Sequence, residues 1–483
     1  MVEKLKHEWF NQPGKNILAG IVVALALIPE AIAFSIIAGV DPMVGLYASF
    51  IIAVVTAIVG GRPAMISGAT GAVALLVTPL VKDYGVEYLL AATILMGVIQ
   101  LVLGLLKVGR LMKFIPHSVM IGFVNALGIM IFMSQIEHIF GISISTYIYV
   151  IVTLLIVYII PKFFKAIPAP LIAIIVLTAL YMYTGSDVRT VGDLGNIKQA
   201  LPNFLIPNVP FNLETLQIIF PYSLSMAIVG LVESLLTAKI VDDATDTYSS
   251  KNRESRGQGI ANMITGLFGG MGGCAMIGQS VINVKSGANS RLSTFSAGVV
   301  LIFMIIVLGG LVVQIPMPIL AGIMVMVSIG TFDWNSFKYI QKAPKTDAVV
   351  MILTVIIVLM THNLALGVVV GVIFSALFFA TKISKVEVTS EKFGKTNRLS
   401  FKGQIFFVSI DSMMDQISFN IENSIIELNF NNAHLWDDSA VDAIDTMVRK
   451  FEEKNNIVHV EKLNSDSRKI VSELSKLNEN HLN

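Results

Sequence analysis

Long apolar segments recur through the first 383 residues of this chain, and they constrain its fold more than any other feature. Hydrophobic residues make up 54% of the sequence and charged residues only 14%. A soluble globule of this composition would expose a very large apolar surface. Because a membrane-spanning helix needs about 20 mostly apolar residues, the sequence predicts an all-α, polytopic membrane protein.

The apolar segments form two sets of seven, and the third member of each set is too short to span a bilayer. The first set lies near residues 17–38, 43–59, 70–82, 88–106, 112–133, 145–160 and 168–184. The second set lies near residues 216–240, 257–270, 275–285, 292–313, 316–332, 345–362 and 364–383. An odd number of segments makes the second set enter the membrane from the opposite side. The sequence therefore predicts 14 segments in a 7+7 inverted repeat, about 17–184 and 216–383.

Each short third segment follows a glycine-containing break. Residues 266–273, Gly-Leu-Phe-Gly-Gly-Met-Gly-Gly, precede a half-helix predicted over 275–284, and a similar break at 60–63 leads through 67–72 to a short apolar segment. Irregular backbone at membrane depth is tolerated only where protein or a water-filled cavity covers it, and helix N-termini attract anions. Two such breaks at matching places predict the anion site of a transporter. Glycine-rich packing between helices is the alternative interpretation.

Basic residues in the short loops predict the orientation, because cytoplasmic loops hold an excess of Lys and Arg. The side opposite the N-terminus has only Lys82, Arg189 and Lys198. The N-terminal side holds Arg62, Lys107, Arg110, Lys113, Lys162, Lys165, Lys251, Arg253, Arg256, Lys285, Arg291, Lys338, Lys342, Lys345, Lys382 and Lys385. We therefore expect a multi-pass protein of the cell membrane with both termini in the cytoplasm.

The composition becomes polar after Thr381, and no further apolar segment follows. Strands are expected at 385–391, 399–409, 424–430 and 457–463, and a helix is expected from Asp438 onward, with Asp437 or Asp438 as its N-cap. Strands that alternate with a helix over about 100 residues predict a small α/β domain. The expected domains are thus a transmembrane transport domain over 1–383 and a cytoplasmic domain over 384–483.

Several classes of function are disfavoured by the sequence. A net charge of +1 without a dense basic patch gives no reason to expect a nucleic-acid partner. Cys274 is the only cysteine, so the chain can form neither an internal disulfide nor a cysteine metal cluster. The chain has no nucleotide-binding or hydrolase motif. We therefore expect neither an enzyme nor a bound cofactor, apart from a coupling ion.

Separate motifs along the whole chain resemble the sulfate permease (SulP) family of anion transporters. They are Ala-Leu-Ile-Pro-Glu-Ala-Ile-Ala-Phe at 26–34, Asp-Pro-Met-Val-Gly-Leu-Tyr at 41–47, Gly-Leu-Val-Glu-Ser-Leu-Leu-Thr at 230–237, Asn-Arg-Glu at 252–254 and the second glycine break. The C-terminal region resembles the STAS domain of these transporters. The resemblance implies a core and a gate domain, and a homodimer in the lipid bilayer. It places the anion between Thr70, Gly71 and Ala72 on one side and Met276, Ile277 and Gly278 on the other.

Two acids, Glu30 and Glu233, fall in the first segments of the two repeats. A carboxylate at bilayer depth costs several kcal/mol unless it is neutralised, paired or hydrated. A proton or a bound Na⁺ can neutralise it, and Thr237, one turn after Glu233, offers a hydroxyl oxygen to Na⁺. In similar cyanobacterial bicarbonate transporters the matching acid and threonine bind Na⁺, whereas in sulfate:proton relatives a glutamate there is linked to proton coupling. The alternative for each acid is a structural hydrogen bond to nearby backbone.

The second half-helix carries Gln279, and the resemblance implies a basic residue close to this position in several eukaryotic relatives. Without that positive charge, the anion requires helix ends and a co-bound cation, which favours symport. Cys274 directly precedes this half-helix, so we expect its thiol to border the cavity; burial as an inert thiol is the alternative.

The sequence thus predicts secondary active transport of a small inorganic oxyanion, bicarbonate or sulfate, coupled to Na⁺ or H⁺ by an elevator-like movement of core against gate. One alternative is a nucleobase:proton symporter of the same membrane fold, although such proteins lack a STAS domain. Another alternative is an uncoupled anion channel or a membrane-anchored sensor.

Overall fold

A computed structural model describes residues 8–109, 114–163, 168–193 and 200–475. Four residues that enter the orientation prediction, Arg110, Lys113, Lys165 and Lys198, lie outside this part of the chain. The chain divides into two compact units, residues 1–372 and 373–483. The sequence places the boundary after residue 383, whereas the units divide inside the last apolar helix, Leu364–Ile383. The buried residues of that helix, from Leu364 to Gly371, all lie in its first half, which agrees with the earlier division.

Each predicted apolar segment coincides with a helix of the structure. The first set corresponds to α2 (Pro13–Ala38), α3 (Pro42–Val59), α4 (Gly71–Tyr84), α5 (Val86–Leu105), α6 (His117–Ile139), α7 (Ile144–Ile159) and α8 (Ala169–Thr184). The second set corresponds to α9 (Leu213–Thr245), α10 (Lys251–Leu267), α11 (Ile277–Lys285), α12 (Arg291–Val312), α13 (Met317–Thr331), α15 (Lys345–Thr361) and α16 (Leu364–Ile383). The short helix α14 (Ser336–Lys342) was not predicted. Within the described residues, nine helical segments are long and apolar enough to cross a membrane.

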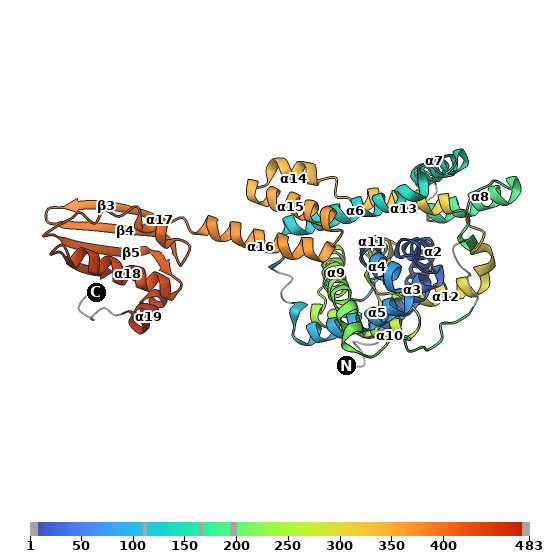
Figure 1. The fold of residues 1–483 in the computed structure, drawn as a ribbon, viewed down its shortest axis with the longest axis horizontal. Helices are drawn as coiled ribbons and strands as arrows, with labels where there is room; N and C mark the ends of the chain where they lie inside the picture. The colour runs from blue at the N-terminus through green and yellow to red at the C-terminus, as the bar shows by residue number, and fades with distance from the viewer. Residues whose placement is uncertain (1–7, 110–113, 164–167, 194–199, 476–483) are drawn as a thin grey trace. The chain divides into compact units, whose positions relative to one another are not determined.

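The helices of the first unit form two groups. Helices α2 to α5 lie with α9 to α12, while α6, α7, α8, α13 and α15 lie beside them as a second layer (Figure 1). Helix α5 packs against α9 and α10, and α12 packs against α2 and α3. The fourth segment of each set therefore packs against the first and second segments of the other set. In the second layer, α6 packs against α13 and α15, and α13 packs against α7.

Two three-residue strands, one from each set of segments, pair with each other. Strand β1 (Ser67–Ala69) pairs antiparallel with β2 (Gly273–Ala275), with Gly68 opposite Cys274. A Cβ at Gly273 would overlap the carbonyl oxygen of Gly68, so this close approach requires glycine. The prediction that the second half-helix begins at Ala275 was wrong: α11 begins at Ile277, because residues 273–275 pair with β1.

The second unit contains one four-stranded sheet, in the order β3-β4-β5-β6. Its strands are β3 (Glu387–Phe393), β4 (Thr396–Ile405), β5 (Ile425–Leu435) and β6 (Ile457–Glu461). Strands β3 and β4 are antiparallel, whereas β4, β5 and β6 are parallel. Helices α17 (Ile410–Met414), α18 (Asp438–Glu452) and α19 (Ser465–Leu474) accompany the sheet. Of the two predicted N-caps of α18, Asp437 fills the role by accepting a hydrogen bond from the Ala440 amide.

Candidate functional site

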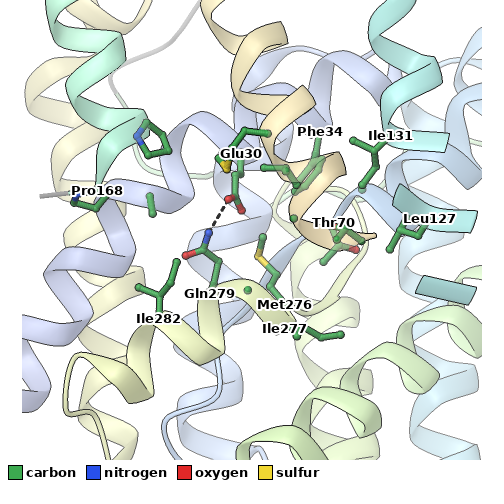
Figure 2. A pocket seen from close by; sticks show the side chains of 18 of the residues that line it. Glu30, Phe34, Thr70, Leu127, Ile131, Pro168, Met276, Ile277, Gln279 and Ile282 are labelled. Carbon is green, nitrogen blue, oxygen red and sulfur yellow. Dashed lines mark hydrogen bonds between the residues drawn. The ribbon is translucent and has the colours of Figure 1, made fainter. Parts of the chain in front are cut away.

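A cavity of about 630 Å³ lies between the two groups of helices in the first unit. Residues of α2, α4, α9 and α11 line it from the first group, and residues of α6, α7, α8 and α13 line it from the second. Figure 2 shows Glu30, Thr70 and Gln279 from the first group with Leu127 and Ile131 of α6 from the second. Apolar side chains dominate the wall, including Phe34, Phe123, Leu127, Ile131 and Ile282. Among the described lining residues, the ionisable side chains are Glu30 and Glu233, and none is Lys or Arg.

The N-termini of both half-helices reach this cavity. Thr70 is the N-cap residue of α4 and Met276 that of α11, and neither side chain caps its helix. The first amide groups of a helix have no partner within the helix, so those of α4 and α11 stay available to a ligand. Five of the six residues between which the family resemblance places the anion, Thr70, Gly71, Met276, Ile277 and Gly278, line the cavity, whereas Ala72 is buried and does not. The β1–β2 pairing is what brings these two helix ends to one place.

Space at the two helix ends differs. A Cβ on Gly71 would lie 2.9 Å from the Phe34 ring and 3.2 Å from Ile131. At Gly278 a Cβ would have no atom within 4 Å among the described residues. The α4 end is therefore tightly packed, and the α11 end leaves room for a bound molecule.

Glu30 lies on α2 and faces α11. The side-chain amide of Gln279 donates a hydrogen bond of 2.7 Å to the Glu30 carboxylate (Figure 2). The other amide atom, Gln279 Oε1, is buried and has no hydrogen-bond partner among the described residues. A buried acceptor without a partner costs about 1–3 kcal/mol, which a ligand with a donor group can recover.

Glu233 lies on α9, is 7% exposed and accepts a hydrogen bond of 3.0 Å from the Cys274 thiol. Thr70 Oγ1 lies 3.2 Å from the same sulfur atom. A line of contacts thus runs from Glu233 through β2 to the N-cap residue of α4. The prediction that Cys274 borders the cavity was wrong: its side chain is fully buried in the strand pair and is not among the lining residues.

Thr237 also points away from the cavity. Its hydroxyl donates a hydrogen bond of 2.7 Å to the Glu233 carbonyl oxygen, and the residue is fully buried. Threonine hydroxyls in helices often bond to the carbonyl one turn earlier in this way. The structure therefore brings Glu30 and Glu233 to the cavity but not Thr237.

Sequence reasoning missed the partners of the two acids. Gln279 lies one turn after Met276 on α11, and this spacing could have indicated that it faces the same cavity. The contact between Cys274 and Glu233 depends on the register of β1 and β2, for which three-residue strands give no sequence signal. The cavity-lining residues of α6, such as Leu127 and Ile131, also give no sequence signal, because an apolar residue that lines a cavity cannot be distinguished in the sequence from one that faces lipid.

Comparisons with known proteins agree with this architecture. The sulfate permease family matches residues 14–157 and 144–354. "Putative sulfate transporter YbaR" of Bacillus subtilis is 55% identical over 98% of this chain and 99% of its own length. "Bicarbonate transporter BicA" of Picosynechococcus sp. is 26% identical over 78% of this chain and 71% of its own length.

Two solved structures have similar folds. The transmembrane domain of a cyanobacterium bicarbonate transporter BicA aligns with a TM-score of 0.66 at 26% identity, covering 76% of this chain and 97% of that one. Murine Slc26a9, an anion transporter in the inward-facing state, aligns with a TM-score of 0.85 at 16% identity, covering 98% of this chain and 90% of that one. At that identity the second likeness concerns the fold alone. With the family match over most of the helical unit and the close relative over nearly the whole chain, this multi-pass membrane protein belongs to the sulfate permease family, whose members here are transporters and not enzymes.

Proposed function

We propose that this chain is a secondary active transporter of a small inorganic oxyanion, bicarbonate or sulfate, coupled to Na⁺ or H⁺. The observation that carries the proposal is the convergence of two uncapped helix N-termini, at Thr70 and Met276, on one cavity. Such helix ends present free amide groups and the positive end of the helix dipole to an anion. Gly278 leaves room for the anion beside α11.

The charge of the cavity supports coupling to a cation. Glu30 and Glu233 line the cavity, and its described lining includes no basic side chain. An anion would therefore enter a site that already holds two acids, which is unfavourable in a medium of low dielectric constant. A proton or Na⁺ carried with the anion would reduce this repulsion.

We place the coupling ion at Glu233, with Glu30 as a second candidate. The thiol that contacts Glu233 is only a weak hydrogen-bond donor, so this carboxylate has the greater need for a cation. The Thr237 hydroxyl gives its hydrogen to a backbone carbonyl, so only its oxygen lone pairs remain for Na⁺. We keep both Na⁺ and H⁺ as candidates at Glu233, and in each case the cation would be a transported substrate.

The packing of the first unit supports the inverted repeat and an elevator mechanism. The contacts of α5 with α9 and α10 correspond to those of α12 with α2 and α3, as expected if the two sets are related by an axis in the membrane plane. We propose that α2 to α5 and α9 to α12 form the core and that α6, α7, α8, α13, α15 and α16 form the gate. Movement of the core against the gate would carry the cavity between the two sides of the membrane.

We further propose that residues 384–483 form a STAS domain in the cytoplasm, as the loop charges suggest, and that the protein is a homodimer. The mixed sheet with α18 and α19 supports this assignment, and so does the fold similarity to Slc26a9 over 98% of this chain. The family match does not favour a nucleobase:proton symporter. An uncoupled anion channel or sensor is separated from the proposal by the experiment below.

The test is uptake by purified protein in liposomes, with labelled bicarbonate and labelled sulfate in separate experiments. An inward Na⁺ gradient and an inward pH gradient are imposed in turn. We expect one of the anions to accumulate above its equilibrium level under one of the two gradients. Flux that follows only the anion's own gradient would indicate a channel, and no flux of either anion would contradict the proposed function.

A further inference from the structure

One face of α10 carries buried polar residues that contact both strands of the β1–β2 pair. Glu254, Gln258 and Asn262 lie four residues apart, so they share one side of the helix, and each is at most 1% exposed. They are also connected, because Gln258 Nε2 donates to Glu254 Oε1 at 2.8 Å and Asn262 Nδ2 donates to the Gln258 carbonyl at 3.0 Å. Burying three such residues costs free energy unless each finds partners.

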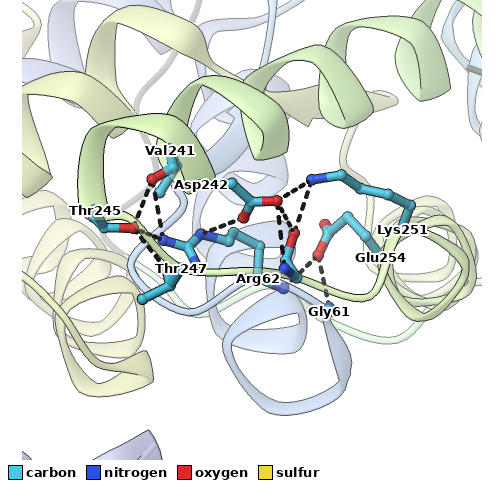
Figure 3. Close-up of polar contacts among 9 residues, drawn as sticks. Gly61, Arg62, Val241, Asp242, Thr245, Thr247, Lys251 and Glu254 are labelled. Carbon is cyan, nitrogen blue, oxygen red and sulfur yellow. Dashed lines mark hydrogen bonds and ion pairs between the residues drawn. The ribbon is translucent and has the colours of Figure 1, made fainter. Parts of the chain in front are cut away.

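Glu254 binds the turn at Gly61 and Arg62, which precedes β1. Its carboxylate accepts hydrogen bonds from the amides of Gly61, at 2.7 Å, and Arg62, at 3.0 Å (Figure 3). The Arg62 side chain is in turn held at the end of α9, where it donates to Thr245 and Thr247 and pairs with Asp242 at 3.4 Å. Asp242 also pairs with Lys251, at the start of α10, at 2.6 Å. The turn is therefore fixed to both α9 and α10 before the chain enters β1.

Gln258 and Asn262 hold the strands themselves. Gln258 Nε2 donates to Ser67 Oγ, on the first residue of β1, at 2.8 Å. Asn262 exchanges two hydrogen bonds with Gly273, the first residue of β2: its amide group donates to the Gly273 carbonyl at 3.0 Å, and its oxygen accepts from the Gly273 amide at 2.9 Å. A two-stranded sheet has open edges, and at membrane depth their polar groups need partners from the protein.

We propose that Glu254, Gln258 and Asn262 are positioning residues for the anion site, an inference that rests on the proposed function. They fix β1 and β2, which lead directly into the N-termini of α4 and α11, and so set the separation of the two helix ends. None of the three lines the cavity, so they act through the strands and not on the anion. In enzymes, a misplacement of the reacting groups by about 1 Å can lower the rate up to about 100-fold, and we expect the affinity of two helix ends for one anion to depend on their separation in a similar way.

Two variants test this inference, each with a matched control on the same helix. Gln258→Met keeps the side-chain length and removes both donors, and Asn262→Leu removes both bonds to Gly273. The controls are Ser255→Ala and Thr265→Val, because each of these buried hydroxyls donates only to a carbonyl of its own helix. Initial rates of labelled sulfate and labelled bicarbonate uptake in liposomes give KM and kcat, and thermal unfolding in detergent gives Tm.

We expect Gln258→Met and Asn262→Leu to raise the KM of the transported anion about tenfold or more, with a smaller change in kcat. The controls should keep KM within about twofold of the wild-type value even where Tm falls. If Gln258→Met or Asn262→Leu does not fold, Ser67→Ala removes only the acceptor on β1 and should raise KM in the same direction. Where Gln258→Met does fold, the double variant Ser67→Ala, Gln258→Met should have about the same KM as Gln258→Met alone, because both changes remove one shared contact.

Wild-type uptake with an unchanged KM in the folded variants, Ser67→Ala included, would overturn the positioning role and leave the proposed function standing. An equal increase of KM in variants and controls would also overturn it, since a general loss of packing would explain both. No uptake of either anion by the wild-type protein would overturn the proposed function, and the inference with it.

Discussion

Glu30 and Glu233 occupy matching places in the two sets of helices, but their hydrogen-bond partners differ. Glu30 is bound by the amide of Gln279, on the half-helix α11 of the other set. Glu233 is bound by the thiol of Cys274 in β2, and the contact continues to Thr70 at the start of α4. Each acid is therefore connected to the end of a different half-helix.

The two partners differ in strength as donors. A carboxamide is a full hydrogen-bond donor, whereas a thiol is a weak one. Because a buried carboxylate depends on its donors for stability, Glu30 is the better satisfied acid without a cation. The difference teaches that acids at matching places in the two sets of helices need not have equivalent hydrogen-bond partners, and it is the reason why we propose Glu233 before Glu30 as the coupling residue.

The largest expected effect comes from removing the charge of each acid in turn. Glu233→Gln keeps the size of the side chain, and its amide oxygen can still accept from the Cys274 thiol, so folding should survive. We expect cation-driven uptake to fall at least about tenfold, which corresponds to about 1.4 kcal/mol. Glu30→Gln should lower uptake by less, about two- to fivefold, because its charge contributes less to cation binding.

Uptake in liposomes under the driving Na⁺ or pH gradient measures both effects, with Tm as the control for folding. Equal losses of uptake in Glu233→Gln and Glu30→Gln would contradict the proposed difference between the two acids. Wild-type uptake in Glu233→Gln would remove the coupling role from this residue.

The next effect concerns the charge that Gln279 lacks. Gln279→Lys places a cation beside the Glu30 carboxylate and near the α11 end of the cavity, where it can meet part of the anion's charge. We expect uptake to depend several-fold less on the imposed cation gradient, while exchange of internal for external anion persists. Gln279→Met, which is similar in length and uncharged, is the control and should keep the gradient dependence.

Much of the helical framework is predictable from sequence, because membrane helices require long apolar segments and leave a strong signal. The breaks at Gly60 and Gly269 also indicate the site, since glycine there contradicts a regular helix. The six residues between which the family resemblance places the anion are more specific than the breaks alone; five of them line the cavity, and Ala72, the second residue of α4, is buried and does not.

The partners of the acids are not predictable in the same way. The Cys274 thiol meets Glu233 because Gly68 pairs with Cys274, and this register depends on tertiary contacts of the two strands with α3 and α9 as well as with α10. Ser49 of α3 and Ser234 of α9 bind the amides of Ala69 and Ala275. Contacts between such distant residues leave no periodic pattern in the sequence. For Thr237 the sequence predicts a contact that the structure does not bring to the cavity. Its spacing from Glu233 is one helical turn, as expected, but its hydroxyl donates to the Glu233 backbone carbonyl.

A smaller effect is expected at Cys274, whose thiol should be unreactive because it is fully buried. Cys274→Ser keeps a donor for Glu233 and should preserve uptake within about threefold. Cys274→Val removes the donor, and leaving the carboxylate without its partner should lower stability by about 1–3 kcal/mol. Uptake and denaturant unfolding measure these changes. Rapid labelling of Cys274 by a maleimide in the folded protein, or equal stability of the Ser and Val variants, would contradict the contact with Glu233.

The smallest effect on the comparison should come from removing the second unit. Both acids and both half-helix ends belong to residues 1–372, which form a compact unit of their own. Deleting the residues after Ser384 should therefore leave the difference between Glu233→Gln and Glu30→Gln unchanged, even if the yield of protein or its oligomeric state alters. The measurement is anion binding to the purified truncated protein, with the two variants repeated in that background. A folded truncation that no longer binds the anion would show that the site requires the second unit, and the roles assigned to the two acids would then have to be re-examined in the whole chain.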